Sequence, residues 1–265
     1  MTLIEYVCEE YQYSEFVANG MIMGGKVLVN EEVCDWINYR LKKKDVVRIK
    51  EKKSKFVTRS GHKLEEAIKR FSLDLSGKTA IDIGASEGGF TDCMLEYGAG
   101  KVYAVDVAYG ILNYRLRANE KVVVLERKNA RNLTEEDIPE TVDLITADVA
   151  FISLDKIIPA SLRFLKEEGK VVLLFKPQFE LPADCLGKNG IPLHQEDVIK
   201  QIHFFVQEMQ QAGLYLNGLI RSPIKGNNGN VEYLLTGGKE SKEVVSAEQI
   251  AQCCNAAETE KFAIL

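Results

Sequence analysis

Metal-binding and disulfide patterns are missing from the sequence. Only three histidines occur in 265 residues, and none of the six cysteines stands in a C-x-x-C pair. Zinc sites and disulfide frameworks depend on recurring spacings of these residues, so the sequence predicts neither. We therefore expect no bound metal, and reduced thiols of the kind usual in the cytoplasm.

Long apolar runs are missing as well. The longest run that looks buried, Val171 to Phe175, is far shorter than the ~20 residues that a membrane-spanning helix needs. The first residues, Met1 to Tyr6, lack the basic head of a secretory signal peptide. The sequence thus predicts a cytoplasmic protein without membrane contact.

An excess of positive charge is missing from the chain as a whole but not from every part of it. The formal net charge is −5, which argues against a protein that binds polyanions over its whole surface. Between Arg40 and Lys63, however, eleven lysines or arginines meet only two acids. Such a run is either a solvated linker or a surface that faces phosphates, and both interpretations stay open.

Residues 1–55 are predicted to form a small α+β unit. Apolar residues recur at three-and-four spacing over residues 3–24, which predicts helix up to Gly24 and Gly25. Residues 26–30 and 46–49 are predicted to be short strands. A unit of this size buries little core by itself.

Residues 56–265 are predicted to form a second, larger α/β unit. Strands are expected at 79–83, 101–105, 121–125, 142–146 and 170–175, and helices between them at 89–97, 153–166 and 195–212. This alternation predicts a parallel, doubly wound sheet. Residues 214–220 and 231–236 have no long helix between them. They should form a hairpin, so that one strand near the C-terminus runs antiparallel.

A turn of small residues follows the first of these strands, in the segment from Ala80 to Phe90. Its glycines, Gly84, Gly88 and Gly89, would let the backbone approach a ligand closely. The spacing fits the G-x-S-x-G turn of methyltransferases around Ser86, and more loosely the dinucleotide pattern G-x-G-x-x-G.

Two carboxylates bear on the choice of cofactor. Asp82 stands two residues before the first glycine of the turn. A negative charge there would suit the cationic sulfonium and amino groups of S-adenosylmethionine better than a pyrophosphate. Asp106 ends the second strand, where an acid can accept both ribose hydroxyls. Asp106 also fits NAD, so it does not discriminate between the two cofactors. A nicotinamide oxidoreductase stays open as an alternative that rests only on the ambiguous glycine turn.

Several motifs in order along the chain resemble one family. They are Thr58–Leu64, Asp82–Thr91, Asp148–Leu154, Phe175–Glu180, Ser222–Gly226 and Asn230–Tyr233. This set is similar to that of the TlyA-type proteins, which are RNA 2′-O-ribose methyltransferases with an FtsJ-like catalytic domain and are often labelled hemolysins. The similarity runs from about residue 20 to 236.

The resemblance implies a fold, a cofactor and a substrate. The fold is the Rossmann-like sheet of S-adenosylmethionine-dependent methyltransferases, preceded by a small S-four-type RNA-binding domain. The substrate is RNA, above all ribosomal RNA or a ribosomal subunit. The family's catalytic residues fall on Lys63, Asp148, Lys176 and Glu232. Its cofactor contacts fall on Gly84, Ser86, Gly88, Phe90, Asp106, Asn129 and Asp148.

The implied reaction is an in-line displacement in which a ribose 2′-oxygen attacks the sulfonium methyl group. The methyl group is already activated, so the difficulty is the weakly acidic hydroxyl. Lys176 is either the base that takes its proton or a cation that steers the oxygen. Burial and Lys63 favour a neutral amine, whereas Asp148 and Glu232 favour the charged form.

The chain departs from the family pattern where it should meet RNA. Residues 13–19 contain no lysine or arginine, although the family carries a basic helix there. Fewer cations mean weaker binding to phosphates. A protein that binds cofactor and RNA without turnover therefore stays an alternative. A hemolysin is less favoured, because no convincing amphipathic segment for lipid is present.

Overall fold

The computed structural model describes residues 1–49, 55–240, 242–256 and 263–264. The middle of the basic run, residues 50–54, therefore lies outside the described residues. The chain divides into two units, Met1–Lys55 and Phe56–Leu265, and each is described by itself.

The first unit has two helices where a single helical stretch was predicted. Helix α1 spans Leu3–Tyr11 and α2 spans Glu15–Met23. The chain breaks between them because Gln12 adopts a left-handed conformation, with φ +54°. Ser14 then starts α2, since its hydroxyl accepts from the N–H of Val17. The periodicity predicted the helical content correctly but missed this break.

A small sheet completes the first unit. Strands β1 (Val27–Val29), β2 (Glu32–Val33) and β3 (Val47–Ile49) pair antiparallel in the order β2-β1-β3. The inner faces of the helices and strands share one apolar cluster that includes Leu3 and Ile22. Arg40 and residues 42–44, which precede β3, are exposed. The described part of the basic run thus lies largely at the surface of this unit.

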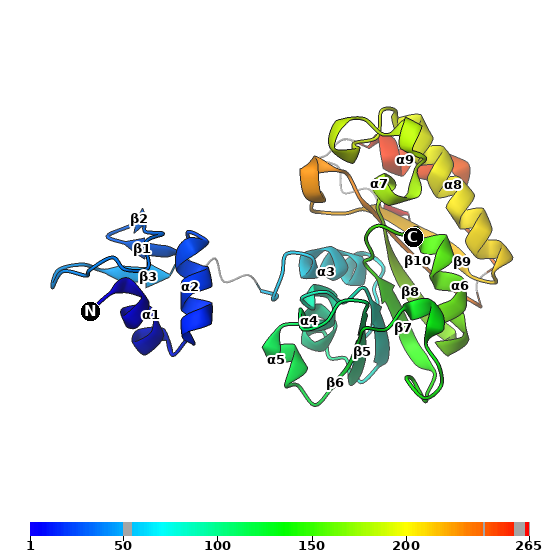
Figure 1. Cartoon of the computed structure of the whole chain (residues 1–265). Coiled ribbons are helices and arrows are strands. Elements are labelled where there is room, and N and C mark those ends of the chain that lie inside the picture. The colour runs from blue at the N-terminus through cyan, green and yellow to red at the C-terminus, as the bar shows by residue number, and fades with distance from the viewer. Residues whose placement is uncertain (50–54, 241, 257–262, 265) are drawn as a thin grey trace. The chain divides into compact units, whose positions relative to one another are not determined.

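The second unit is built on a mostly parallel sheet, as predicted (Figure 1). Its parallel strands are β4 (Thr79–Ile83), β5 (Lys101–Asp106), β6 (Val122–Glu126), β7 (Val142–Ala147) and β8 (Leu165–Phe175). β9 (Tyr215–Arg221), β10 (Tyr233–Gly238) and β11 (Ala263–Ile264) extend it in the order β11-β9-β10-β8-β7-β4-β5-β6. β10 runs antiparallel to both of its neighbours, β8 and β9, which confirms the predicted hairpin.

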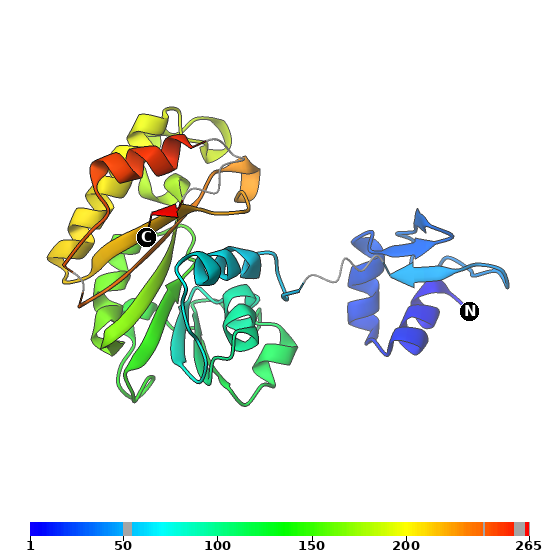
Figure 2. The same ribbon diagram turned by 180° about the vertical axis from the view of Figure 1, so that it is seen from behind.

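Helices cover both faces of this sheet. One face packs against α3 (Gly61–Arg70) and α4 (Gly89–Glu96), and the short α5 (Tyr114–Arg117) joins them. The other face packs against α6 (Ile158–Ser161), α8 (Gln195–Gln211) and α9 (Ala247–Asn255). α9 lies along α8, as Figure 2 shows from behind. The layers are those of a doubly wound α/β fold.

The prediction of a helix over residues 153–166 is mostly wrong. Only α6 is α-helical there, between two short 3₁₀ turns, and β8 already begins at Leu165. Pro159 lies in the first turn of α6, where its missing N–H is tolerated. A proline further along a helix would break it, so the long helix could not have continued through this position.

Candidate active site

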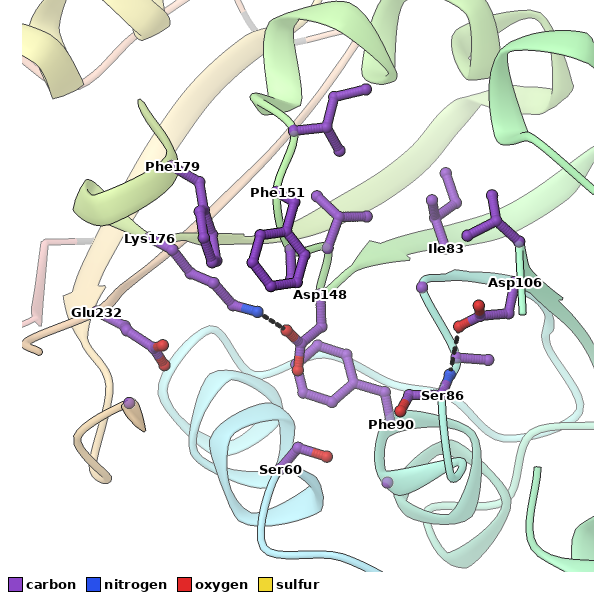
Figure 3. A pocket seen from close by; sticks show the side chains of 18 of the residues that line it. Ser60, Ile83, Ser86, Phe90, Asp106, Asp148, Phe151, Lys176, Phe179 and Glu232 are labelled. Atoms are coloured by element: carbon purple, nitrogen blue, oxygen red, sulfur yellow. Dashed lines mark hydrogen bonds and ion pairs between the residues drawn. The ribbon is translucent and has the colours of Figure 1, made fainter. Parts of the chain in front are cut away.

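A cavity of about 880 Å³ opens at the carboxyl ends of the parallel strands (Figure 3). Its walls come from the segments after β4, β5, β7 and β8, from the start of α3 and from residues 226–232. Ligands of open α/β sheets bind at this edge, and the volume is that of a small-molecule site.

The glycine turn after β4 forms the floor of the cavity. Gly84 has φ +80°, and a Cβ there would lie 2.5 Å from the carbonyl oxygen of Asp148. A Cβ on Gly89 would collide with the hydroxyls of Ser60 and Thr58. The turn therefore needs glycine at both positions, because the backbone passes directly against its neighbours.

Asp106 holds this turn in shape. Its carboxylate accepts the N–H of Ser86 and the N–H of Ala108, each at 2.8 Å. Asn129 lies in the same wall, and its side-chain oxygen accepts the N–H of Arg131 at 3.1 Å. Phe90 closes the floor with its buried ring. Of the predicted cofactor contacts, the structure brings Gly84, Ser86, Gly89, Phe90, Asp106, Asn129 and Asp148 to one cavity.

Asp82 and Gly88 do not reach the cavity. The carboxylate of Asp82 is fully buried and accepts the hydroxyls of Thr91 and Thr146 at 2.6 and 3.0 Å. Burial raises the pKa of Asp82 to about 6, although these hydrogen bonds oppose the rise. Gly88 is the N-cap residue directly before α4, and a Cβ there would collide with Leu116. Both residues shape the turn from behind, so a direct cofactor contact is not expected from either.

Two ion pairs lie side by side in the cavity wall. Lys176 Nζ is 2.5 Å from Asp148 Oδ1, and Lys63 Nζ is 2.5 Å from Glu232 Oε2. The four side chains are 3% to 16% exposed. Charges buried to this degree are weakly screened by salt. The structure thus gathers all four predicted catalytic residues at one place, from α3 and from the ends of three strands.

Two aromatic rings at the cavity mouth were not predicted. Phe151 follows Asp148 closely, is 92% exposed and has φ +64°, a conformation that is rare for a bulky residue. Its ring centroid is 5.2 Å from that of Phe179. Figure 3 shows both rings beside Lys176. An exposed ring held in a strained backbone points to function, but a lone phenylalanine in a loop gives no such signal in the sequence.

Two side-chain amides in the cavity wall were also missed. Asn230 is 3% exposed, and its Oδ1 has no hydrogen-bond partner among the described residues. Oε1 of Gln178 likewise has no hydrogen-bond partner within the described part of the chain. Both residues line the cavity. The glycine- and asparagine-rich segment around Asn230 predicts a turn, but not which cavity that turn borders.

Two features are not found in the part of the chain that the structure describes. No three histidine, cysteine, aspartate or glutamate side chains gather there into a set that could hold a metal ion. No helix among the described residues is long and apolar enough to cross a membrane.

The chain is similar to known proteins over most of its length. The family model described as FtsJ-like methyltransferase matches residues 56–239. The 16S/23S rRNA (cytidine-2′-O)-methyltransferase TlyA of Mycobacterium tuberculosis is 38% identical over 205 residues, which are 77% of this chain and 76% of that protein. Hemolysin A of Brachyspira hyodysenteriae is 37% identical over 238 residues, or 88% and 98% of the two chains. A solved structure of a candidate hemolysin from Streptococcus thermophilus superimposes with a TM-score of 0.75 at 32% identity, covering 96% of this chain and 94% of that one.

Proposed function

The chain belongs to the FtsJ-like methyltransferase family, and from this premise we propose that it methylates the 2′-hydroxyl of a ribose in ribosomal RNA. It is a methyltransferase, and its methyl donor is S-adenosylmethionine. The observation that carries the proposal is the pairing of Lys176 with Asp148 and of Lys63 with Glu232 in one cavity. A ribosomal substrate also implies that the enzyme works in the cytoplasm.

The floor of the cavity fits the methyl donor. The missing side chains of Gly84 and Gly89 let the turn pass directly against Asp148 and Ser60, which gives the floor its shape, and both glycines line the cavity. Asp106 faces the cavity and can offer further lone pairs to ribose hydroxyls. When bound, S-adenosylmethionine supplies a methyl group on a positively charged sulfur. We propose that Gly84, Ser86, Gly89, Phe90, Asp106, Asn129 and Asp148 hold it.

Lys176 is proposed to orient the attacking oxygen as a cation. Its partner Asp148 supplies a compensating negative charge at 2.5 Å, and the opposite charges favour each other. An ammonium group beside the 2′-oxygen would stabilise the negative charge that develops there during attack, while the hydroxyl proton passes to water and S-adenosylhomocysteine leaves. Lys63 and Glu232 would fix the ribose from the other side. Orientation of this kind can supply a large part of a rate enhancement.

Phe151 is proposed to stack on the base of the target nucleotide. The ring is exposed at the cavity mouth, next to Phe179 and to the proposed catalytic lysine. Enzymes that modify a nucleotide take it out of its stack and hold the base against aromatic side chains. A ring at this position would keep the base outside while the ribose enters the cavity.

The first unit is proposed to bind RNA as an S-four-type domain. Arg40, Lys42, Lys43 and Lys44 are exposed on it, and phosphates would be their partners. Its α2 lacks basic residues altogether. The affinity from this unit should therefore depend on the loop before β3 rather than on the helix.

The proposal is tested by nucleoside mass spectrometry of ribosomal RNA incubated with the protein and S-adenosylmethionine. A 2′-O-methylated nucleoside is expected with the wild-type chain. Lys176→Ala should lower the rate by about 100-fold or more, whereas Lys200→Ala, on the exposed side of α8, should not change it. Binding of the methyl donor without any methylated nucleoside would instead favour a binding protein without turnover.

A second variant distinguishes the two roles of Lys176. Arginine keeps the positive charge and cannot act as a base, because it does not lose its proton in proteins. Lys176→Arg should therefore retain more activity than Lys176→Ala if the residue orients the oxygen. Equal inactivity of the two variants would assign Lys176 the role of base.

A further inference from the structure

A buried carboxylate outside the catalytic set ties two segments of the active site together. Glu180 ends α7 (Pro177–Glu180), the short helix that follows Lys176. We propose that Glu180 is a positioning residue. It fixes the loop after β7, residues 148–153 (the Phe151 loop), against residues 176–180 (the Lys176 segment), so that Phe151 and Lys176 meet the substrate in the correct relative position. This inference rests on the proposed RNA methylation, whose target nucleotide Phe151 would contact.

The hydrogen bonds of Glu180 all go to one loop. Its Oε1 accepts the N–H of Leu154 at 3.0 Å, and its Oε2 accepts the hydroxyl of Ser153. Ser153 precedes a 3₁₀ turn but does not cap it with its own side chain. Glu180, 26 residues after Leu154 in the chain, provides that cap instead. The loop after β7 is therefore held at its far end by a residue that follows β8.

This contact is the third of three that follow one another along the same two segments. At the strand ends, Asp148 pairs with Lys176. Further out, Phe151 packs against Phe179 with ring centroids 5.2 Å apart. Glu180 then closes the series on Ser153. Beyond Phe151, the loop is anchored by the fully buried side chain of Leu154 in the core, and Glu180 adds the polar contacts that orient its backbone there.

Burying the carboxylate of Glu180 is costly, because it exchanges water for the hydrogen bonds from Ser153 and Leu154. The residue is 9% exposed, and no lysine or arginine in the described part of the chain lies within ion-pair distance of it. Burial raises the pKa of Glu180 in spite of the hydrogen bonds from Ser153 and Leu154. Asp155 adds to this rise, and Lys156 opposes it. The cost of burying this carboxylate suits a role in which its hydrogen bonds fix the position of the loop.

Loss of the bridge should affect chemistry more than cofactor binding. The floor that receives the methyl donor comes from the turn after β4, which Glu180 does not touch. Phe151 and Lys176 are proposed to face the nucleotide, whereas Asp148, which is proposed to hold the donor, directly follows β7 and makes neither of the hydrogen bonds to Glu180. A misplacement of about 1 Å at reacting groups can cost about 100-fold in rate. The expected signature is a slower methyl transfer at unchanged affinity for S-adenosylmethionine.

Three variants and one control test the inference in the full chain. Glu180→Ala removes both acceptors. Glu180→Gln keeps an acceptor for Leu154 N–H, and its amide can donate to the Ser153 hydroxyl. Ser153→Ala removes only one bond. Glu208→Gln is the matched control, because Glu208 lines the same small hollow as Glu180 and Ser153, and the described residues show no hydrogen bond or ion pair from its side chain to the loop.

Three measurements are made on each variant. Hydrogen exchange reports the protection of the Leu154 amide, calorimetry reports the Kd for S-adenosylmethionine, and single-turnover assays report the rate on ribosomal RNA. For Glu180→Ala we expect exchange about tenfold faster or more, a Kd within about twofold of wild type, and a rate lower by about 10- to 100-fold. Glu180→Gln should restore most of the rate, Ser153→Ala should be intermediate, and Glu208→Gln should match the wild type.

The inference is overturned if Glu180→Ala keeps the wild-type rate, if its rate falls without faster exchange at Leu154, or if cofactor affinity falls in parallel. Should Glu180→Ala not fold, wild-type exchange and rate in Ser153→Ala would overturn it. A wild-type protein that methylates no RNA would refute the proposed function instead. In that case the exchange data alone would still decide whether Glu180 holds the loop.

Discussion

Replacing Asp82 by asparagine separates a structural role from a cofactor contact. The sequence suggested that this carboxylate meets the cationic donor, but it lies beneath the turn between Thr91 and Thr146. Asparagine can keep these contacts. Its oxygen can accept from Thr91, and its amide can donate to Thr146 Oγ1, whose hydrogen can turn to the carbonyl of Ile81 at 3.3 Å.

The magnitude follows from the pKa of Asp82, which burial raises from 3.8 to about 6. The charge of the nearby Asp148 adds to the rise. Because the folded state holds the proton more tightly than the unfolded chain, this contribution to stability is complete below pH 3.8 and disappears as the pH rises through 6. A rise of about 2 pH units corresponds to about 3 kcal/mol in the free energy of unfolding.

The assay compares denaturant unfolding of wild type and Asp82→Asn at pH 5 and pH 8. Asparagine carries no such charge, so its stability relative to wild type should improve by about 1 kcal/mol between the two pH values. Asp143→Asn is the control of opposite sign. Burial would raise the pKa of Asp143, but the hydrogen bonds from Lys166 and Thr79 outweigh it and lower the pKa. Asp143→Asn should therefore be destabilising at pH 8 and less so in acid.

Calorimetry with S-adenosylmethionine completes this test. The structure leads us to expect a Kd for Asp82→Asn within a few-fold of wild type. A loss of affinity beyond about tenfold, or about 1.4 kcal/mol, would mean that Asp82 faces the donor after all. A stability difference that stays constant with pH would refute the argument from the buried charge.

Three further changes test other parts of the molecule. Gly84→Ala should abolish cofactor binding measurable by isothermal calorimetry, because alanine is strained at φ +80° and its Cβ would lie 2.5 Å from a carbonyl oxygen. Unchanged affinity would contradict the argument that the turn must lie directly against that carbonyl. Phe151→Ala should raise the KM for RNA about tenfold, as expected for one lost base stack, while the donor Kd stays constant; an equal KM would exclude stacking. Replacing Lys42, Lys43 and Lys44 together by glutamate should weaken RNA binding and reduce its salt dependence, whereas an unchanged salt slope would place the RNA elsewhere.

The sequence predicted the sheet well because its strands have sharp ends. The apolar runs of β4 and β5 stop at a glycine or an acid, and the structure ends them within a residue of the prediction. Asp82 was wrongly predicted to contact the cofactor, because only its position in the chain, two residues before the glycine turn, was considered. Side chains alternate along a strand, so Asp82 shares a face with Ala80, on which α4 packs. That alternation could have predicted its burial, whereas the exposed ring of Phe151 depends on a loop conformation that no local pattern encodes.

The antiparallel strand explains why four residues so distant in the sequence can act together. Asp148 and Lys176 directly follow parallel strands, so both lie at the carboxyl edge of the sheet. Glu232 directly precedes β10, and a parallel β10 would have placed it at the opposite edge, about 20 Å away for a strand of this length. Because β10 is antiparallel and Tyr233 pairs with Phe175, Glu232 instead lies beside the strand end that carries Lys176. There it meets Lys63 from α3. The reversal of this strand is therefore a requirement of the active site, since a carboxylate before a parallel strand could not have joined the two lysines.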